Sequence, residues 1–418
     1  MVCAVLVDVS AAGWVLGLVA AGFLGYCSCG FAVDMDLCLL NTDISYNILS
    51  RLPADILVQL KMVSKGWQHF IADPDFMRLQ MKMAEPILIS GYFFQEKYLY
   101  CDIDVEKLSY IPIKAKETKI YQNILEFLPE KVTILGSSNG LVCCRSCIPS
   151  PDPLIYICNP VSKKWMTVKW DRINRKDYIA FSFEPSSTSS MNENTDYNLV
   201  RVFEVDVHTP GKEEFYFTFE TYNWERRVWV KSKEICHCED SLCITKYVLV
   251  KGILYWLTDG HILLMFDIAN ELSLLITLPI PFTEGKLPEI CLGESDGELH
   301  CVVVSPEGLM IWALEDCFSS NWDLRSFISF EVMEEENPQY LCNLAERVST
   351  SVGEKVPWMQ LLAFKDGKLF LRVSNSAYSF DIQTRRICFL CDMLDLGHEF
   401  VGATVVPYSV TMASVADS

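Results

Sequence analysis

The sequence predicts a chain that is α+β by segments: a small three-helix module followed by a large all-β domain. Three observations predict this. Between residues 38 and 83, apolar side chains recur at helical spacing. From residue 85 to residue 410, short apolar runs rich in Val, Ile, Phe, Tyr and Trp alternate with polar turns. Glycine-led strands also recur along the second segment, which favours a β-propeller over the alternative, a large β-sandwich.

The composition fits a folded protein that avoids nucleic acid. Of 418 residues, 50% are hydrophobic and 21% are charged, which excludes a largely disordered chain. The formal net charge of −19 repels phosphate backbones, so we expect no nucleic-acid partner. The 18 cysteines often stand inside apolar runs, as at residues 142–144, and this favours free thiols in a reducing compartment.

Residues 1–35 form a hydrophobic leader with three interpretations. Residues 9–33 contain no charged side chain and are long enough to cross a bilayer. The first basic residue is Arg51, so the positive flank of a signal peptide is missing. The leader is therefore an optional or non-native start before Met35, a membrane anchor, or a helix packed on the body. Membrane association is expected only through residues 9–33.

The helical module spans residues 38–83. The spacing predicts a first helix over 39–52, a second over 54–62 and a third that starts after Ser64, a residue suited to capping a helix. Pro53 ends the first helix and suits the start of the second. Residues 73–75 read as a turn, after which another helical stripe begins. Such short helices leave an apolar surface for a partner.

The β segment spans residues 85–410, and residues 411–418 form a C-terminal tail. A weak repeat starts at each of four glycines, Gly140, Gly252, Gly297 and Gly367. Each glycine leads a strand, and a later strand usually ends in an Asn or Asp that suits a tight turn. Because the spacings are uneven, the repeat leaves the number of blades open.

Several patterns that suggest chemistry have simpler explanations. Residues 136–140 match G-x-S-x-G, but the residues that follow continue as a strand and not as the helix of a nucleophile elbow. Cys236, His237 and Cys238 with Cys243 lack zinc-finger spacing. We therefore expect no catalytic residue, no metal site and no cofactor. The six histidines form no paired motif and are expected on the surface or in loops.

Two polar segments are expected to be loops. Residues 185–195, rich in Ser and Asn, predict a surface loop. Residues 334–336, three consecutive glutamates, predict a solvated acidic loop. The alternative for these glutamates is that they face a basic substrate.

The helical module closely resembles the F-box. The resemblance is carried by "LNTDISYNILSRLPADILVQLKMVSKGWQHFIADPDF", which departs from the family pattern at Asn41, where proline is usual. It implies docking onto the Skp-type adaptor of a cullin-RING ubiquitin ligase. The residues that would contact the adaptor, or form the core beneath the contact, are Leu40, Ile44, Leu49, Leu52, Pro53, Leu57, Val63 and Trp67.

The β segment is similar to the F-box-associated, kelch-related region of plant F-box proteins. Segments such as "GSSNGLVCC", "VKGILYWLTDG", "LGESDGELHCVVV" and "FKDGKLFLR" carry this resemblance in their order. In that family such a region recruits the protein to be ubiquitinated.

Together these observations predict a non-catalytic substrate-recognition subunit of an SCF-type ubiquitin ligase. Its expected partners are the adaptor, the cullin-RING ligase behind it and an unidentified protein target, in the cytoplasm, the nucleus or both. Two alternatives stay open: a membrane-anchored propeller scaffold, and a propeller that binds a small ligand.

Overall fold

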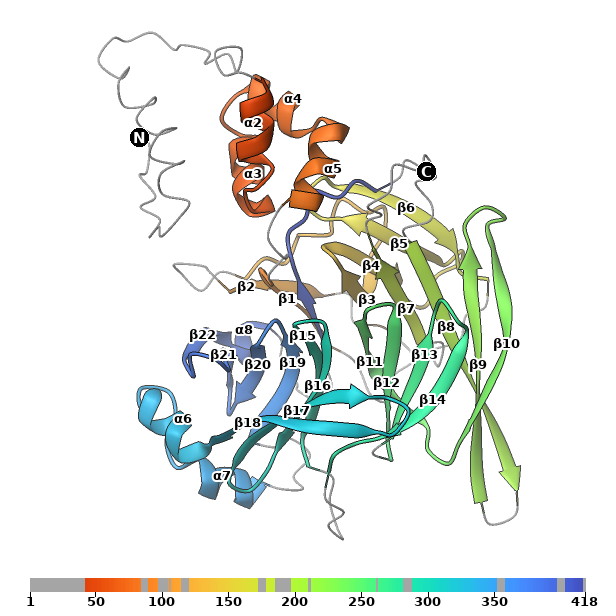
Figure 1. Ribbon diagram of the computed structural model, residues 1–418, viewed down its shortest axis with the longest axis vertical. Helices are drawn as coiled ribbons and strands as arrows, with labels where there is room; N and C mark the ends of the chain where they lie inside the picture. Colours follow the sequence, from red (N-terminus) through yellow and green to blue (C-terminus); the bar gives the residue numbers. More distant parts are fainter. Residues whose placement is uncertain are drawn as a thin grey trace. The chain divides into compact units, whose positions relative to one another are not determined.

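The protein consists of two compact units, Met1–Pro86 and Ile87–Ser418 (Figure 1). We describe each unit by itself. The computed structural model describes residues 42–83, 89–96, 104, 107–113, 120–171, 178–184, 197–209, 212–260, 262–280, 288–351, 358–396 and 403–415. The predicted leader and the predicted loop at 185–195 lie outside these residues. None of the helices within them is long and apolar enough to cross a membrane.

The described part of the first unit is helical. Its helices are α2 (Thr42–Leu49), α3 (Ala54–Leu60), α4 (Lys65–Ile71) and α5 (Pro74–Met83). Ser64 caps α4 as predicted, because its hydroxyl accepts a hydrogen bond from the Trp67 amide at 3.3 Å. The prediction of a turn at residues 73–75 is wrong. The Asp73 carboxylate accepts from the Phe76 amide at 3.0 Å, so Asp73 caps α5 and Pro74 occupies its first turn.

The second unit is a β-propeller, and no sandwich of two packed sheets is formed by its described residues. Blade 1 combines β1 (Gly91–Glu96), β2 (Leu108–Pro112) and the C-terminal β23 (Ala403–Tyr408). Blade 2 contains β3 (Val132–Ser138), β4 (Leu141–Ser146), β5 (Leu154–Asn159) and β6 (Lys164–Lys169). Blade 3 contains β7 (Tyr178–Phe183), β8 (Tyr197–Thr209), β9 (Lys212–Asn223) and β10 (Val228–Cys238).

The remaining strands form three more antiparallel meanders. Blade 4 contains β11 (Leu242–Val250), β12 (Ile253–Thr258), β13 (Ile262–Asp267) and β14 (Leu272–Thr277). Blade 5 contains β15 (Ile290–Ser295), β16 (Glu298–Val304), β17 (Gly308–Asp316) and β18 (Asn321–Ser329). Blade 6 contains β19 (Met359–Lys365), β20 (Lys368–Val373), β21 (Ser376–Asp381) and β22 (Ile387–Asp392). Blades 5 and 6 join through a short parallel pairing of β15 with β19.

The innermost strands of the blades close a ring. Around the ring, β3, β7, β11, β15, β19 and β23 each contact the next, and β23 contacts β3. In blade 1 the C-terminal β23 pairs antiparallel with β1, so the last strand of the chain closes the ring against the first. The blade number that the sequence left open is therefore six in the described part of the chain.

The predicted glycine repeat corresponds to the turns between the first and second strands of four blades. Gly140, Gly252, Gly297 and Gly367 have φ angles of 81°, 79°, 73° and 68°. The residue before each glycine also has a positive φ. Two successive residues of this kind form the tight hairpin turn that matches strand twist, and glycine adopts the second position without steric cost.

The Asn and Asp residues of the repeat cap the turns between the third and fourth strands. Asn159, Asp267, Asp316 and Asp381 each accept a backbone amide of the turn that follows, at 2.8 to 3.0 Å. Asn223 does the same in blade 3, accepting from the Arg226 amide at 2.8 Å. These side chains take the place of backbone acceptors and fix the turns. The sequence predicts this role for Asn159, Asp267 and Asp381, whereas it does not single out Asp316 and Asn223.

Apolar cores lie between neighbouring blades. Between blades 1 and 2, for example, Phe93 and Tyr408 pack with Ile134 and Tyr156. Burying a large apolar side chain of this kind stabilises the fold by about 2 kcal/mol. Similar clusters lie between blades 3 and 4, 4 and 5, 5 and 6, and 6 and 1.

Three helices in this unit are not predicted by the sequence. They are α6 (Phe330–Glu336), α7 (Leu344–Ser351) and α8 (Met393–Leu396). Residues 334–336 therefore end a helix and do not form the expected loop. Ser329 caps α6, while Phe330 and Met333 are buried, so this helix is held by its apolar face on the blades.

Candidate functional site

The helical unit places the predicted adaptor residues in two groups. Leu49, Leu57 and Trp67 are buried and form its core. Leu52 is half-buried, whereas Pro53 and Val63 are exposed. Leu40 lies outside the described residues, and Ile44 lies on α2 with a side chain that is not described. The structure thus separates positions that can touch a partner from positions that support them.

Three exposed apolar side chains of this unit are missing from the predicted set: Met62, Ile48 and Met83, the last of which is 37% exposed at the end of α5. Met62, just after α3, is 80% exposed, and Ile48 on α2 is 40% exposed. Val63 beside Met62 is 48% exposed. Single exposed apolar side chains are common, but neighbouring ones such as Met62 and Val63 are candidates for a docking surface. The sequence signal for Ile48 was its place in the helical stripe, whereas nothing in the spacing singles out Met62.

Aromatic contacts and a hydrogen bond hold the helices together. The Tyr46 ring packs edge-on against Phe70 and Phe76 at centroid distances of 4.9 and 5.5 Å. The Gln80 amide donates to the Leu52 carbonyl oxygen at 3.1 Å, which ties α5 to the segment between α2 and α3. That segment carries Leu52 and Pro53, so its conformation is fixed before any partner binds.

In the propeller, a cavity of about 260 Å³ lies among the inner strands. Its lining includes β3, β11, β15, β19 and β23 and the turns that carry three of the repeat glycines. Four charged residues alternate in sign around it: Glu184, Lys251, Glu294 and Lys365. The Lys365 ammonium pairs with the Glu294 carboxylate. The volume lies below that of pockets for drug-sized ligands, so the cavity does not favour a small-ligand site.

The C-terminal residues pack on the propeller next to this cavity. After β23, residues 411–413 and Val415 are buried. The buried Asn159 amide donates to the carbonyl oxygens of Thr411 and Ala413 at 3.3 and 2.7 Å. The Tyr197 hydroxyl donates to the Ser414 carbonyl at 3.1 Å. The predicted tail is therefore held against blades 2 and 3 over residues 411–415.

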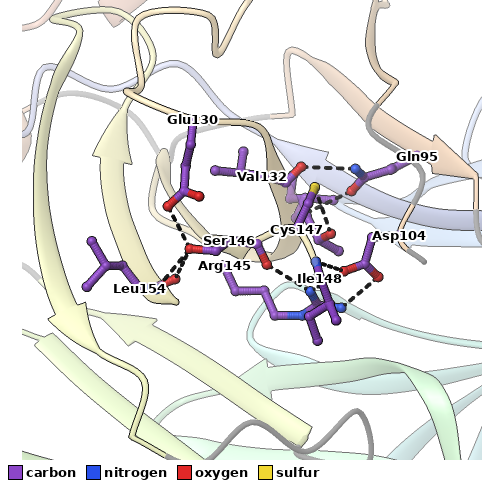
Figure 2. Close-up of polar contacts among 11 residues, drawn as sticks. Gln95, Asp104, Glu130, Val132, Arg145, Ser146, Cys147, Ile148 and Leu154 are labelled. Carbon is purple, nitrogen blue, oxygen red and sulfur yellow. Dashed lines mark hydrogen bonds and ion pairs between the residues drawn. The ribbon is translucent and has the colours of Figure 1, made fainter. Parts of the chain in front are cut away.

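A polar network joins blade 1 to blade 2 (Figure 2). Gln95 on β1 donates to the Val132 carbonyl at 3.1 Å and accepts from the Ile134 amide at 2.8 Å. Arg145 at the end of β4 forms two bonds to Asp104, at 2.6 and 3.0 Å. Both side chains are mostly buried. Each polar group in this network has a partner, so it reads as a structural clasp and not as a reactive site.

The patterns that suggested chemistry have structural roles in the propeller. Residues 136–140 run from β3 through a turn into β4, without the helix of a nucleophile elbow. Burial raises the pKa of the Cys236 thiol to about 11 and that of Cys243 to about 11. A raised pKa disfavours the thiolate that a nucleophile or metal ligand needs. The described residues contain no cluster of three metal-ligating side chains.

One expectation about histidine is wrong. His300 on β16 is buried, and its Nδ1 lies 3.1 Å from the Glu298 carbonyl oxygen. Its ring packs against Phe364 of β19 at a centroid distance of 5.6 Å. The contact crosses from blade 5 to blade 6, which no spacing in the sequence reveals.

Comparisons with known proteins agree with these two units. Residues 109–344 match the family described as F-box protein At3g26010-like, beta-propeller, and residues 37–79 match the F-box domain. The chain is 24% identical to F-box protein At5g49610 of Arabidopsis thaliana, over 82% of this chain and 96% of that protein. It is 23% identical to F-box protein At5g07610 of the same plant, over 85% and 86%. It is 26% identical to the putative F-box/kelch-repeat protein At3g17570, over 56% and 57%.

Proposed function

Because this chain belongs to the family of F-box proteins with an At3g26010-like β-propeller, we propose that it is the target-binding subunit of an SCF-type ubiquitin ligase. The observation that carries the proposal is the combination of an F-box with a propeller in one chain, as two compact units. The F-box would hold the Skp-type adaptor and the cullin-RING ligase behind it. The propeller would hold a protein target, in the cytoplasm, the nucleus or both.

In this role the chain acts by proximity. Two binding units on one chain raise the effective concentration of a target lysine near the ubiquitin carrier. Bond making is left to other subunits of the complex, so the role requires no nucleophile, metal or cofactor here. The buried thiols and the clasped polar network are compatible with this assignment.

We assign the adaptor contact to the exposed and half-exposed apolar positions in the two segments that join α2 to α3 and α3 to α4. Leu52, Pro53 and Val63 belong to the set that the resemblance implies, and Met62 joins them by its exposure. Leu49, Leu57 and Trp67 act as the core beneath the contact. Leu40 and Ile44 stay in the proposed set on the resemblance alone.

A pull-down of the full chain with a purified Skp-type adaptor tests this proposal. Val63→Asp places a charge in the proposed contact and should weaken binding by about 2 kcal/mol, or about 30-fold in Kd. Met83→Asp is the matched control, because it places the same charge at an exposed apolar position of the same unit, at the end of α5 and outside the two assigned segments. Circular dichroism confirms that both variants are folded.

The outcomes separate the two parts of the proposal. No adaptor binding by the folded wild type would refute the ligase role. Binding that Val63→Asp and Met83→Asp weaken equally would refute the assigned surface while keeping the role.

A further inference from the structure

Blade 3 carries an aromatic face to which no binding partner has yet been assigned. We define this blade-3 aromatic face by five side chains: Arg201, Phe203, Tyr222, Trp224 and Trp229. Tyr222 on β9 stands directly opposite Trp229 on β10, and Arg201 on β8 stands opposite Glu220. Directly paired residues and residues two apart share a side of a sheet, so Arg201, Phe203, Tyr222 and Trp229 lie on one face, and Trp224 in the turn after β9 packs on Tyr222. Strands β8 to β10, green in Figure 1, are also longer than those of the other blades.

The rings of this face form a connected ladder. Tyr222 packs edge-on against Trp224 and Trp229 at centroid distances of 4.8 and 5.3 Å. Trp224 continues the ladder to Tyr197 at 5.7 Å and donates from its indole nitrogen to the Tyr197 carbonyl at 2.5 Å. Trp229 donates to the Lys169 carbonyl of blade 2 at 3.4 Å.

The buried Arg201 packs against two rings of the face and holds them in position. The Arg201 guanidinium, 1% exposed, lies 4.3 Å from the Trp229 ring centroid and 5.0 Å from that of Phe203. It is neutralised by Glu220 at 2.5 Å and by Asp171 at 2.8 Å. The rings are thus ordered in the free protein, which lowers the entropy cost of binding a partner.

Exposed cations surround the ladder. Arg226 and Arg227 lie in the turn between β9 and β10, Lys231 lies two residues beyond Trp229, and Lys169 ends β6. All four are exposed, and within the described part of the chain no ion pair is formed by any of them. The turn is already shaped, because Asn223 accepts the Arg226 amide at 2.8 Å. Glu225 in the same turn and the half-exposed Asp171 are acidic, but the four cations outnumber them, so this surface has the opposite sign to the net charge of −19 of the chain.

We propose that the blade-3 aromatic face binds an acidic segment of a partner protein. Carboxylates would pair with Arg226 and Arg227, and an apolar side chain would pack on Tyr222 and Trp229. Trp, Tyr and Arg are the residues that dominate binding energy at protein interfaces. A nucleic acid fits less well, because its many phosphates would meet the acidic remainder of the chain. The proposal rests on the proposed function in one respect: the segment would belong to the ubiquitination target.

Selection from a phage-displayed library of short random peptides tests the proposal, with the full chain as bait. Peptides retained by the wild type should be acidic and should contain an aromatic or aliphatic residue. Arg226→Glu combined with Arg227→Glu should lower retention of that pool by about tenfold or more. Both side chains are exposed, so the variant is expected to fold.

The matched control lies in blade 6. Arg385 and Arg386 occupy the equivalent turn between β21 and β22, are exposed, and Arg385 shares the positive φ of Arg227. Arg385→Glu with Arg386→Glu therefore makes the same change in net charge away from the aromatic face. It should retain the pool as the wild type does.

The other outcomes overturn the proposal. A basic or neutral pool, no enrichment, or equal loss in both double variants would each contradict an acidic ligand at this face. Release of the pool by a single-stranded oligonucleotide more readily than by poly-glutamate would assign the face to nucleic acid. Adaptor binding is measured in parallel with the same proteins. Its absence in the wild type would refute the ligase role without altering the peptide result.

Discussion

Asp366 shows how one carboxylate in a turn couples stability to pH. It precedes Gly367 between β19 and β20, and its carboxylate accepts the Ile89 amide at 2.9 Å. Burial raises the pKa of this carboxyl, against the opposing effect of Lys365. The folded state therefore holds the proton more tightly than the unfolded chain. The contribution to stability is present below the unfolded pKa and is lost as pH rises through the folded pKa.

Asp366→Asn should accordingly raise the free energy of unfolding at pH 7 and raise it less near pH 4.5, where the wild type is partly protonated. Urea unfolding at the two pH values measures this. Asp296→Asn is the control, since it makes the same change before Gly297 at an exposed position. An equal gain at both pH values would assign the effect to the turn preference of Asn and contradict the raised pKa.

Asn159 serves a turn and the C-terminal residues together. Its side-chain Oδ1 accepts the Val161 amide, and its side-chain Nδ2 donates to the carbonyl oxygens of Thr411 and Ala413. Asn159→Ala should lower the free energy of unfolding by about 2 to 3 kcal/mol, because it leaves buried carbonyls unpaired. Asp267→Ala removes the same kind of turn cap in blade 4, where the described C-terminal residues make no bond. Equal losses in the two variants, measured by urea unfolding, would show that the bonds to residues 411 and 413 contribute nothing.

At the scale of the elements, the turns of the propeller were easier to predict from the sequence than its helices and its cavity. Glycine and Asn or Asp specify a turn through their own backbone preferences, so the repeat could be recognised from local chemistry alone. Helices α6 to α8 could not be recognised in this way, because such short helices are stabilised mainly by packing their apolar faces on the blades. The charged residues around the cavity were missed for the same reason: four blades far apart in sequence bring them together.

The candidate adaptor site was predictable in part. Spacing and resemblance marked the apolar positions of the helical unit, but they could not tell the buried Trp67 from the exposed Val63. That distinction depends on how the helices pack. The blade-3 aromatic face gave no signal either, since its rings come from three strands and the turn between β9 and β10, and only strand pairing brings them together.

Two of the repeat glycines have identical backbone roles but different neighbours. A Cβ at Gly367 would meet no atom within 4 Å, whereas a Cβ at Gly140 would lie 2.4 Å from the Thr411 Cβ. Gly367→Ala should therefore cost only the positive-φ strain, about 1 kcal/mol. Gly140→Ala should cost about 1 to 3 kcal/mol more, because the C-terminal residues must shift. Thermal unfolding of both variants measures the difference. Equal costs would mean that residues 409–411 can shift to make room for the methyl group without lowering the free energy of unfolding.

At the scale of the whole molecule, ring closure leads us to expect that folding requires β23. β23 pairs with β1 and contacts β3 and β19, so it seals the junction between blades 6 and 1 and between blades 1 and 2. Residues of β23 also belong to the apolar cores on both sides of blade 1. A propeller without this strand would expose two inter-blade cores at once.

Two truncations of the full chain separate closure from the packing of the C-terminal residues. A chain that ends at Tyr408 keeps β23 and loses the bonds to Asn159 and Tyr197, so it should unfold cooperatively at a lower temperature. A chain that ends before Ala403 loses the closing strand and should show no cooperative transition by calorimetry, because blades 1, 2 and 6 lose shared burial together. If the shorter chain unfolded as sharply as the longer one, the ring would not act as one cooperative unit. Each blade buries its faces only against its neighbours, so the loss of one inter-blade contact also destabilises the next blade. We therefore expect β23, which joins the two ends of the ring, to contribute more to the free energy of unfolding than its length suggests.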